Sequence, residues 1–244
     1  MVDINDWFAK IKEVNEPDEI NDFLIEIGND PQLEFLSFLN HFIEHPEKDI
    51  YEHIKMNLIY DLGQIGKLLK LEDTYIDYLI NEYYKSDRWI RNEIISVFNK
   101  ISEKNNLSEK VLQLIGASLN EDYIPIKSNA IKVLLNVNNI PELALKNILN
   151  ILNQSNEDLL IMGTKILRKN IISENALFDL LNNSENYKIL KKKAIRVLLM
   201  EYFKSLFEIE RFREKILSSD WMDQYRLMFL KEIDIFQRLL LKNL

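Results

Sequence analysis

Residues 41–45, His-Phe-Ile-Glu-His, are the segment whose residue types and spacing most resemble a catalytic site. His41 and His45 are four positions apart, so on a helix they would lie one turn apart with Glu44 beside them. Two histidines and a glutamate in this order could bind zinc and supply a general base for hydrolysis. Whether they do so depends on the helix that carries them.

A helix over residues 31–45 would place these side chains away from the core. His41 and His45 fall nearly opposite its apolar face and Pro46 ends it, while no further acidic ligand follows at a suitable position. A catalytic zinc needs three protein ligands and a supporting shell. We therefore interpret the pattern as accidental and expect no metal and no cofactor; an adventitious surface site from Glu34, His41 and His45 is the alternative. The expected apolar face consists of Phe35, Leu36, Leu39, Phe42 and Ile43.

Composition narrows the functional classes. The chain has 244 residues, of which 47% are hydrophobic, as in an ordinary folded protein. It has no cysteine, which excludes disulfides, thiolate metal sites and cysteine nucleophiles. The first residues lack the apolar run of a signal peptide, and no segment is long and apolar enough to span a membrane. We expect a cytoplasmic protein.

The negative charge is concentrated at the start of the chain. Residues 1–50 contain thirteen acidic and three basic side chains, whereas the whole chain carries a net charge of −8. An acidic segment repels nucleic acid and suits a basic partner. The alternative is that the acids serve solubility alone.

Apolar residues recur at helical spacing along almost the whole chain, so an all-α fold is predicted. Asp30-Pro31 and Asn139-Ile140-Pro141 look like helix starts, and Asp73, Ser108 and Ser173 are further candidate caps. The connections are short, which makes successive helices antiparallel neighbours. The predicted helices are 5–14, 18–28, 31–45, 49–69, 74–85, 88–103, 108–119, 123–137, 141–153, 158–170, 174–182, 187–203, 206–217 and 222–242.

A repeat is visible in the second helix of each predicted pair. Ile94, Ala130, Gly163 and Ala194 each precede Val97, Val133, Ile166 or Val197 by three positions, and Leu58 and Leu227 extend the series at steps of 31 to 36 residues. Such a period, with two helices per unit, is typical of a helical solenoid. Small residues at three of these positions indicate close helix contact.

Asp87, Asp122, Asp158 and Asp220 lie in the turns, and Arg91, Lys127 and Lys191 lie three residues before the shared position. The pattern resembles HEAT and armadillo-type repeats. The resemblance implies a right-handed α-solenoid of about six antiparallel helix pairs, forming one continuous domain over residues 31–244. Acidic capping helices over residues 1–30 would precede it, with Trp7, Phe8 and Ile11 facing inward. A plain helical bundle is the alternative.

A basic stripe is predicted on the helix over 187–203. Lys188, Lys192 and Arg196 recur every four residues, with Lys191 and Lys193 beside them. In HEAT-like proteins the second helices line the concave surface, so the resemblance implies a groove that could bind an acidic peptide, phosphate or nucleic acid. A solvated helix face is the alternative, and pairing with turn acids is the favoured role of Arg91 and Lys127. The candidate binding residues are Lys188, Lys191, Lys192, Arg196, Lys127 and Arg91.

Aromatic residues provide a second candidate surface, because tyrosine and tryptophan often anchor interfaces. The candidates are Tyr83, Tyr84, Trp89 and Trp221. A family of alkylpurine DNA glycosylases also has a HEAT-like fold, and resembles this chain in length and in tryptophans beside Asp87 and Asp220. A pI near 5.1 disfavours that interpretation, because DNA binding depends on neutralising phosphates.

The sequence therefore favours a non-catalytic scaffold that binds a protein partner through a concave face and the acidic N-terminal cap. Two forms remain open, namely an adaptor within an assembly and an acidic inhibitor, such as an immunity protein that masks a basic toxin. The alternative from another class is a HEAT-like DNA glycosylase, or another nucleic-acid-binding protein that uses the stripe at residues 188–196. No enzymatic motif supports catalysis.

Overall fold

The computed structural model describes residues 16–44 and 47–242, and all regular secondary structure in these ranges is helical. The prediction of an all-α fold is confirmed. The predicted helix over 5–14, with Trp7, Phe8 and Ile11, lies outside the described residues. None of the described helices is long and apolar enough to cross a membrane.

The chain divides into two compact units. Unit 1 comprises residues 1–115 and 121–137, and unit 2 comprises residues 116–120 and 138–244. Helix α7 (Glu109–Ser118) contains the boundary between residues 115 and 116. The predicted division into capping helices and one continuous repeat domain stays a prediction.

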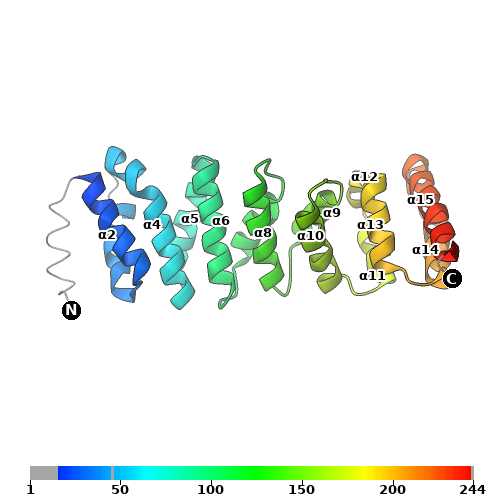
Figure 1. Ribbon diagram of the computed structural model, residues 1–244, viewed down its shortest axis with the longest axis horizontal. Coiled ribbons are helices and arrows are strands. Elements are labelled where there is room, and N and C mark those ends of the chain that lie inside the picture. Colours follow the sequence, from blue (N-terminus) through cyan, green and yellow to red (C-terminus); the bar gives the residue numbers. More distant parts are fainter. Residues whose placement is uncertain (1–15, 45–46, 243–244) are drawn as a thin grey trace. The chain divides into compact units, whose positions relative to one another are not determined.

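Unit 1 is organised around two central helices. Helix α4 packs against α2, α3 and α6, and α6 packs against α5 and α8. Figure 1 shows α2, α4, α6 and α8 side by side. The helices of this unit are α2 (Pro17–Asn29), α3 (Leu36–Glu44, after the short 3-10 helix η1, Leu33–Phe35), α4 (Lys48–Leu68), α5 (Asp73–Lys85), α6 (Arg88–Ser102) and α8 (Ile124–Asn136).

Unit 2 pairs its helices in the same way. Helix α9 packs against α10 and α12, α11 packs against α12 and α14, and α15 packs against α13 and α14. The helices are α9 (Glu142–Ile151), α10 (Glu157–Asn170), α11 (Glu174–Asn182), α12 (Ser184–Ile189), α13 (Lys192–Tyr202), α14 (Leu206–Leu217) and α15 (Asp223–Lys242).

Side-chain caps fix several helix starts. The Asp87 carboxylate accepts hydrogen bonds from the amides of Trp89 and Ile90 at the start of α6. Ser173 caps α11 as predicted, and Ser205 with Glu208 forms a reciprocal capping box at the start of α14. These local signals explain why most predicted bounds lie close to the observed ones.

The predicted helix start at Asp30-Pro31 is wrong. Asp30 is the C-cap of α2, and its carboxylate accepts a hydrogen bond from the Gln32 side chain at 3.2 Å. The next helical turn begins only at Leu33. The Asp-Pro pair therefore serves a turn between helices, a role for which both residues are equally suited.

The predicted helix over 187–203 is also wrong, because it is broken into α12 and α13. Leu190 and Lys191 are extended between them, and Leu190 is buried. Asn153 stabilises the break from a neighbouring helix pair: its side chain donates to the Ile189 carbonyl and accepts from the Lys191 amide, both at 2.8 Å. A side chain thus replaces the helical hydrogen bonds that are lost here.

The shared small position is confirmed as buried at Ala130, Gly163 and Ala194, and Leu58 is buried as well. Leu227 is 64% exposed, so the extension of the repeat to that residue is wrong. In α15 the buried residues are Phe229, Glu232 and Ile233. The register there is therefore shifted from the predicted one.

Candidate functional site

The histidine pattern lies only partly within the described residues, so its interpretation as accidental stays a prediction. His41 is partly exposed, and its ring lies edge-on to that of Phe42 at 5.3 Å. His45 lies outside the described residues. Within the residues that are described, no group of three histidine, aspartate or glutamate side chains could hold a metal ion. The buried face of α3 consists of Phe38, Leu39 and Phe42, of which Leu39 and Phe42 had been predicted.

Basic side chains early in the second helices form ion pairs between helix pairs. The Arg91 guanidinium lies 2.8 Å from the Glu121 carboxylate, as expected for a structural role, and Tyr83 donates to the same carboxylate at 3.0 Å. Lys55, which occupies the same position one repeat earlier, lies 3.0 Å from Glu52 and 3.4 Å from the buried Glu82. These bases therefore neutralise acids of unit 1, and the predicted binding role of Arg91 stays a prediction.

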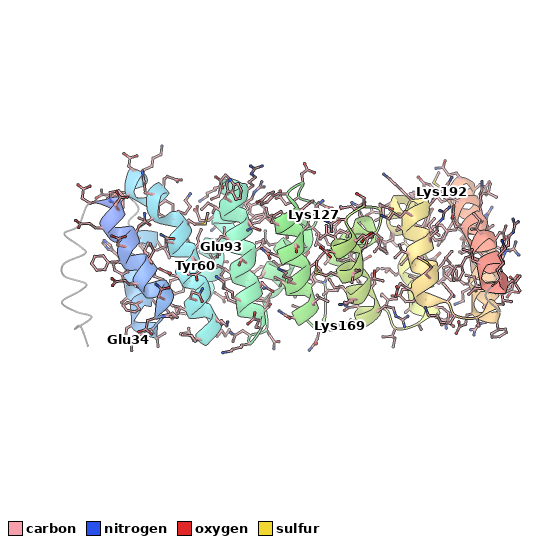
Figure 2. The ribbon with its side chains drawn as sticks, viewed as in Figure 1. Glu34, Tyr60, Glu93, Lys127, Lys169 and Lys192 are labelled. Carbon is pink, nitrogen blue, oxygen red and sulfur yellow. The ribbon has the colours of Figure 1, made fainter. Side chains whose placement is uncertain are left out.

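Lys127 occupies the third position of this series and is also largely buried on α8. Its position is labelled in Figure 2. A lysine that buries its stem in this way contributes packing as well as charge. Its predicted role in binding stays a prediction.

Arg196 is likewise held by an acid. Its Nε donates to Glu232 at 2.6 Å, and the Glu232 side chain is only 1% exposed while that of Arg196 is 55% exposed. This hydrogen bond raises the pKa of Arg196. The pair keeps a buried carboxylate compensated, because an unpaired charge there would be costly.

The remaining bases of the predicted stripe do not share one helix. Lys188 is on α12, Lys191 is the N-cap of α13 and Lys192 is its first residue, labelled in Figure 2. All three are exposed. A spacing of four residues therefore does not align them, although positive charge at a helix N-terminus could attract an anion. That they bind a ligand stays a prediction.

The aromatic candidates differ in exposure. Tyr83 is buried, whereas Tyr84 is 69% and Trp89 is 52% exposed. The Arg88 guanidinium lies 5.0 Å from the Trp89 ring and 5.4 Å from that of Tyr123. Tyr84 and Trp89 thus remain available as an interface in unit 1, but Tyr83 is a packing residue.

Trp221 belongs to the core of unit 2, since it is only 3% exposed. Its ring stacks on Tyr187 at 4.6 Å and on Phe178 at 6.1 Å, and its Nε1 donates to Asn182 at 3.0 Å. The predicted alternative, packing between repeats, accounts for this residue. Its edge nevertheless reaches a cavity of about 510 Å³ between α11, α12 and the end of α14.

The most uniform charged surface is the solvent face of α2. Its acids, together with Glu16 before it and Asp30 after it, are all exposed, and residues 16–30 contain no base. Asp18, Asp22 and Glu26 follow one another every four residues, opposite the buried Ile20, Leu24 and Ile27. Acids at this spacing repel one another and slightly weaken a helix. The acidic face, as we call residues Glu16, Asp18, Glu19, Asp22, Glu26 and Asp30, therefore favours positively charged partners.

Sequence reasoning missed the buried Asp61 of α4, which is 1% exposed and whose two carboxylate oxygens lack hydrogen-bond partners. Burial raises its pKa to about 8, against a smaller lowering by Lys100. Lys100 lies 3.4 Å from Glu93 and 4.0 Å from the Tyr60 ring, and Figure 2 labels Tyr60 and Glu93 on the neighbouring helices α4 and α6. The repeat pattern could have predicted this burial, because Asp61 follows Leu58 by three residues, as Val97 follows Ile94.

No family model matches this chain, and no curated protein was found to be similar to it. Its function must therefore be inferred from the geometry of its exposed side chains and its cavity. That geometry offers exposed charge, exposed aromatic residues and a polar cavity.

Proposed function

We propose that the chain is a non-catalytic scaffold that binds a basic protein partner, with the acidic face of α2 as part of the interface. Its two forms, an adaptor and an inhibitor that masks a basic protein, share this chemistry. Two of the bases that could have served an acidic ligand are engaged, because Arg91 and Arg196 pair with Glu121 and Glu232, whereas the exposed lysines lie apart on α12 and at the start of α13. The charge that stays available is predominantly acidic, in a chain of net charge −8.

The acidic face is the observation that carries this proposal. Asp18, Asp22 and Glu26 repel one another along one side of α2, and no base in residues 16–30 relieves them. A cationic partner would remove that repulsion on binding, and would also be steered toward the surface from a distance. Solubility alone needs negative charge but not this alignment.

We also propose that the helix pairs form a right-handed solenoid. The period of 31 to 36 residues supports it, as does the packing of each even-numbered helix of unit 1 against the next. Ion pairs and hydrogen bonds recur between neighbouring helix pairs, for example Asn57 to Asn21 at 3.0 Å and Asn129 to Asn92 at 3.1 Å. In a solenoid each repeat contacts only its neighbours, which is the pattern that these bonds follow.

Affinity capture from the native host tests the function. The full chain is compared with the variant Asp18→Lys, Asp22→Lys, Glu26→Lys and with a control that reverses exposed acids of unit 2, Glu157→Lys, Asp158→Lys, Glu214→Lys. We expect one basic protein to be retained stoichiometrically by the wild type and the control and lost from the α2 variant. Weakening by salt would follow from the exposed charges.

Two outcomes would contradict the proposal. Equal retention by the α2 variant would show that the acidic face is not the interface. Retention of nucleic acid in place of protein, abolished by Lys188→Glu and Lys192→Glu, would favour the nucleic-acid-binding alternative.

A further inference from the structure

The cavity of unit 2 is lined by two carboxylates, those of Asp179 and Asp220. It has a volume of about 510 Å³, within the usual range for ligand sites. Asp179 and Asp220 line it from α11 and from the loop after α14, and both side chains are exposed. Neither carboxylate forms an ion pair with any residue in the described ranges.

Two of the hydroxyl groups that line the cavity, those of Ser218 and Ser219, are oriented by the end of α14. Ser218 Oγ donates to the Glu214 carbonyl at 3.0 Å, and Ser219 Oγ donates to the Ile216 carbonyl at 2.7 Å. A hydroxyl group that already donates its hydrogen to a carbonyl can only accept a hydrogen bond from a ligand. The serines therefore add to the acceptors that the two aspartates supply.

Lys215 is the only basic residue among those that line the cavity, and it is engaged elsewhere. Its Nζ donates to the Asn175 side chain at 2.6 Å and lies 5.4 Å from the centre of the Phe178 ring. Among the described residues, its Nζ does not come within 4.0 Å of the Asp179 or Asp220 carboxylate, the distance that defines an ion pair. The two carboxylates are thus left for a ligand.

Helix ends reinforce the negative character of this cavity. Asp179 and Asn182 lie in the last turn of α11, and Ser218 is the C-cap of α14. The C-terminal end of a helix carries partial negative charge and favours cations. Two such ends and two carboxylates favour a cation with several N–H donors, and a guanidinium offers five in a fixed plane.

We infer that this cavity binds an arginine side chain of the basic protein partner, with Asp179 and Asp220 accepting from its guanidinium. The inference rests on the proposed function for the identity of the partner, whereas the chemistry of the cavity can be tested without it. Trp221 provides the readout, since its indole N–H lies against the cavity and is held by Asn182. A cation placed here changes the environment of that group.

The test is a titration of the ¹⁵N-labelled full chain with the peptide acetyl-Gly-Gly-Arg-Gly-Gly-amide. The matched peptide carries citrulline, which has the same shape without the charge. The Trp221 indole signal is assigned by elimination, with the variants Trp7→Phe and Trp89→Phe. We expect saturable shifts of this signal and of the Ser218 and Ser219 amides with the arginine peptide and none with the citrulline peptide.

Two variants distinguish the cavity from general attraction to an acidic protein. Asp179→Asn with Asp220→Asn should weaken peptide binding at least about tenfold, because two charge-assisted hydrogen bonds are lost. Glu157→Gln with Asp158→Asn removes the same charge from the exposed first turn of α10 and should leave binding nearly unchanged. Equal weakening by both pairs, or equal binding of both peptides, would overturn the inference.

Further experiments test whether the ligand is a protein side chain, and distinguish failure of the cavity assignment from failure of the proposed function. Tighter binding of free L-arginine than of the peptide, or displacement of the peptide by a single-stranded oligonucleotide, would overturn the assignment to a protein partner. If the captured partner binds the Asp179→Asn, Asp220→Asn variant as well as it binds wild type, the cavity assignment fails and the proposed function stands. If the peptide binds but no basic protein is captured, the proposed function fails instead.

Discussion

Single residues of this protein show where helical packing tolerates charge and where it does not. Asp61 is buried without partners, in the register where Val97 and Val133 are fully buried. Gly28 of α2 makes room for it, since a Cβ there would lie 2.7 Å from Asp61 Oδ1. The packing therefore suits a neutral side chain.

We predict that Asp61 makes stability fall as the pH rises. Its pKa is about 8 in the folded chain against an ordinary 3.8, so the folded state binds the proton more tightly. The contribution of this carboxyl to the free energy of unfolding is therefore highest below about pH 4 and declines up to about pH 8. Asp61→Asn should remove that decline and raise the free energy of unfolding near pH 8 by on the order of a few kcal/mol.

Urea unfolding of wild type and Asp61→Asn near pH 5 and near pH 8.5 measures this effect, with the exposed Asp22→Asn as control. A gain for Asp61→Asn that is the same at both pH values would show that the carboxyl does not titrate in this range.

Arg196 and Lys192 are predicted to behave differently although both belong to the same basic run. Arg196→Ala leaves the buried Glu232 unpaired and should lower the melting temperature, whereas Lys192→Ala at the exposed start of α13 should not. Thermal unfolding measures both. Combining Arg196→Ala with Glu232→Gln should restore part of the loss, and the absence of any rescue would mean that the ion pair is not its cause.

At the level of helices, the space around a glycine shows how closely the neighbouring helix packs against it. A Cβ on Gly63 of α4 would lie 2.8 Å from Val97 Cγ2, a stiff buried side chain of α6. A Cβ on Gly163 of α10 would lie no closer than 3.7 Å to its neighbours. The first position demands glycine and the second does not.

We therefore predict opposite effects of the same substitution. Gly63→Ala should destabilise the protein by about 1–3 kcal/mol, because α4 and α6 must separate. Gly163→Ala should stabilise it by about 0.5–1 kcal/mol, because alanine is the better helix former and its methyl group fits. Chemical denaturation of both variants measures the difference, and a loss of stability in Gly163→Ala would contradict the contact distances.

Helix positions were largely predictable from the sequence, because capping residues and apolar spacing are local signals. Asp87 and Ser173 mark starts that the structure reproduces. The break between α12 and α13 was not predictable, since it depends on Asn153, a residue 36 and 38 positions away from its partners Ile189 and Lys191. The predicted stripe failed for the same reason, as it assumed that one helix carried all its members.

The candidate sites were predictable only where their residues are close together in the sequence or occupy equivalent positions of the repeat. The pairing of Arg91 with a turn acid followed from the repeat pattern, and the acidic face followed from the composition of residues 1–50. The cavity did not, because Asp179 and Asp220 are brought together by the packing of α11 against α14. Residues 41 positions apart give no local signal.

For the whole molecule, the proposed solenoid predicts an extended particle. A compact chain of 244 residues would have a radius of gyration of about 18 Å. Small-angle X-ray scattering of the monomer should give a clearly larger value and a distance distribution with a long tail. A value near that of a compact chain would rule the solenoid out.

The bonds between neighbouring helix pairs also determine how the chain can fold. Side-chain hydrogen bonds between neighbouring helix pairs span about one repeat, as in the bond from Asn183 to Glu142, 41 positions apart. Low contact order of this kind favours fast folding, because only short loops must close. During synthesis each segment would therefore find its bonding partners once about forty further residues have left the ribosome, so that the N-terminal helices need not wait for the C-terminus.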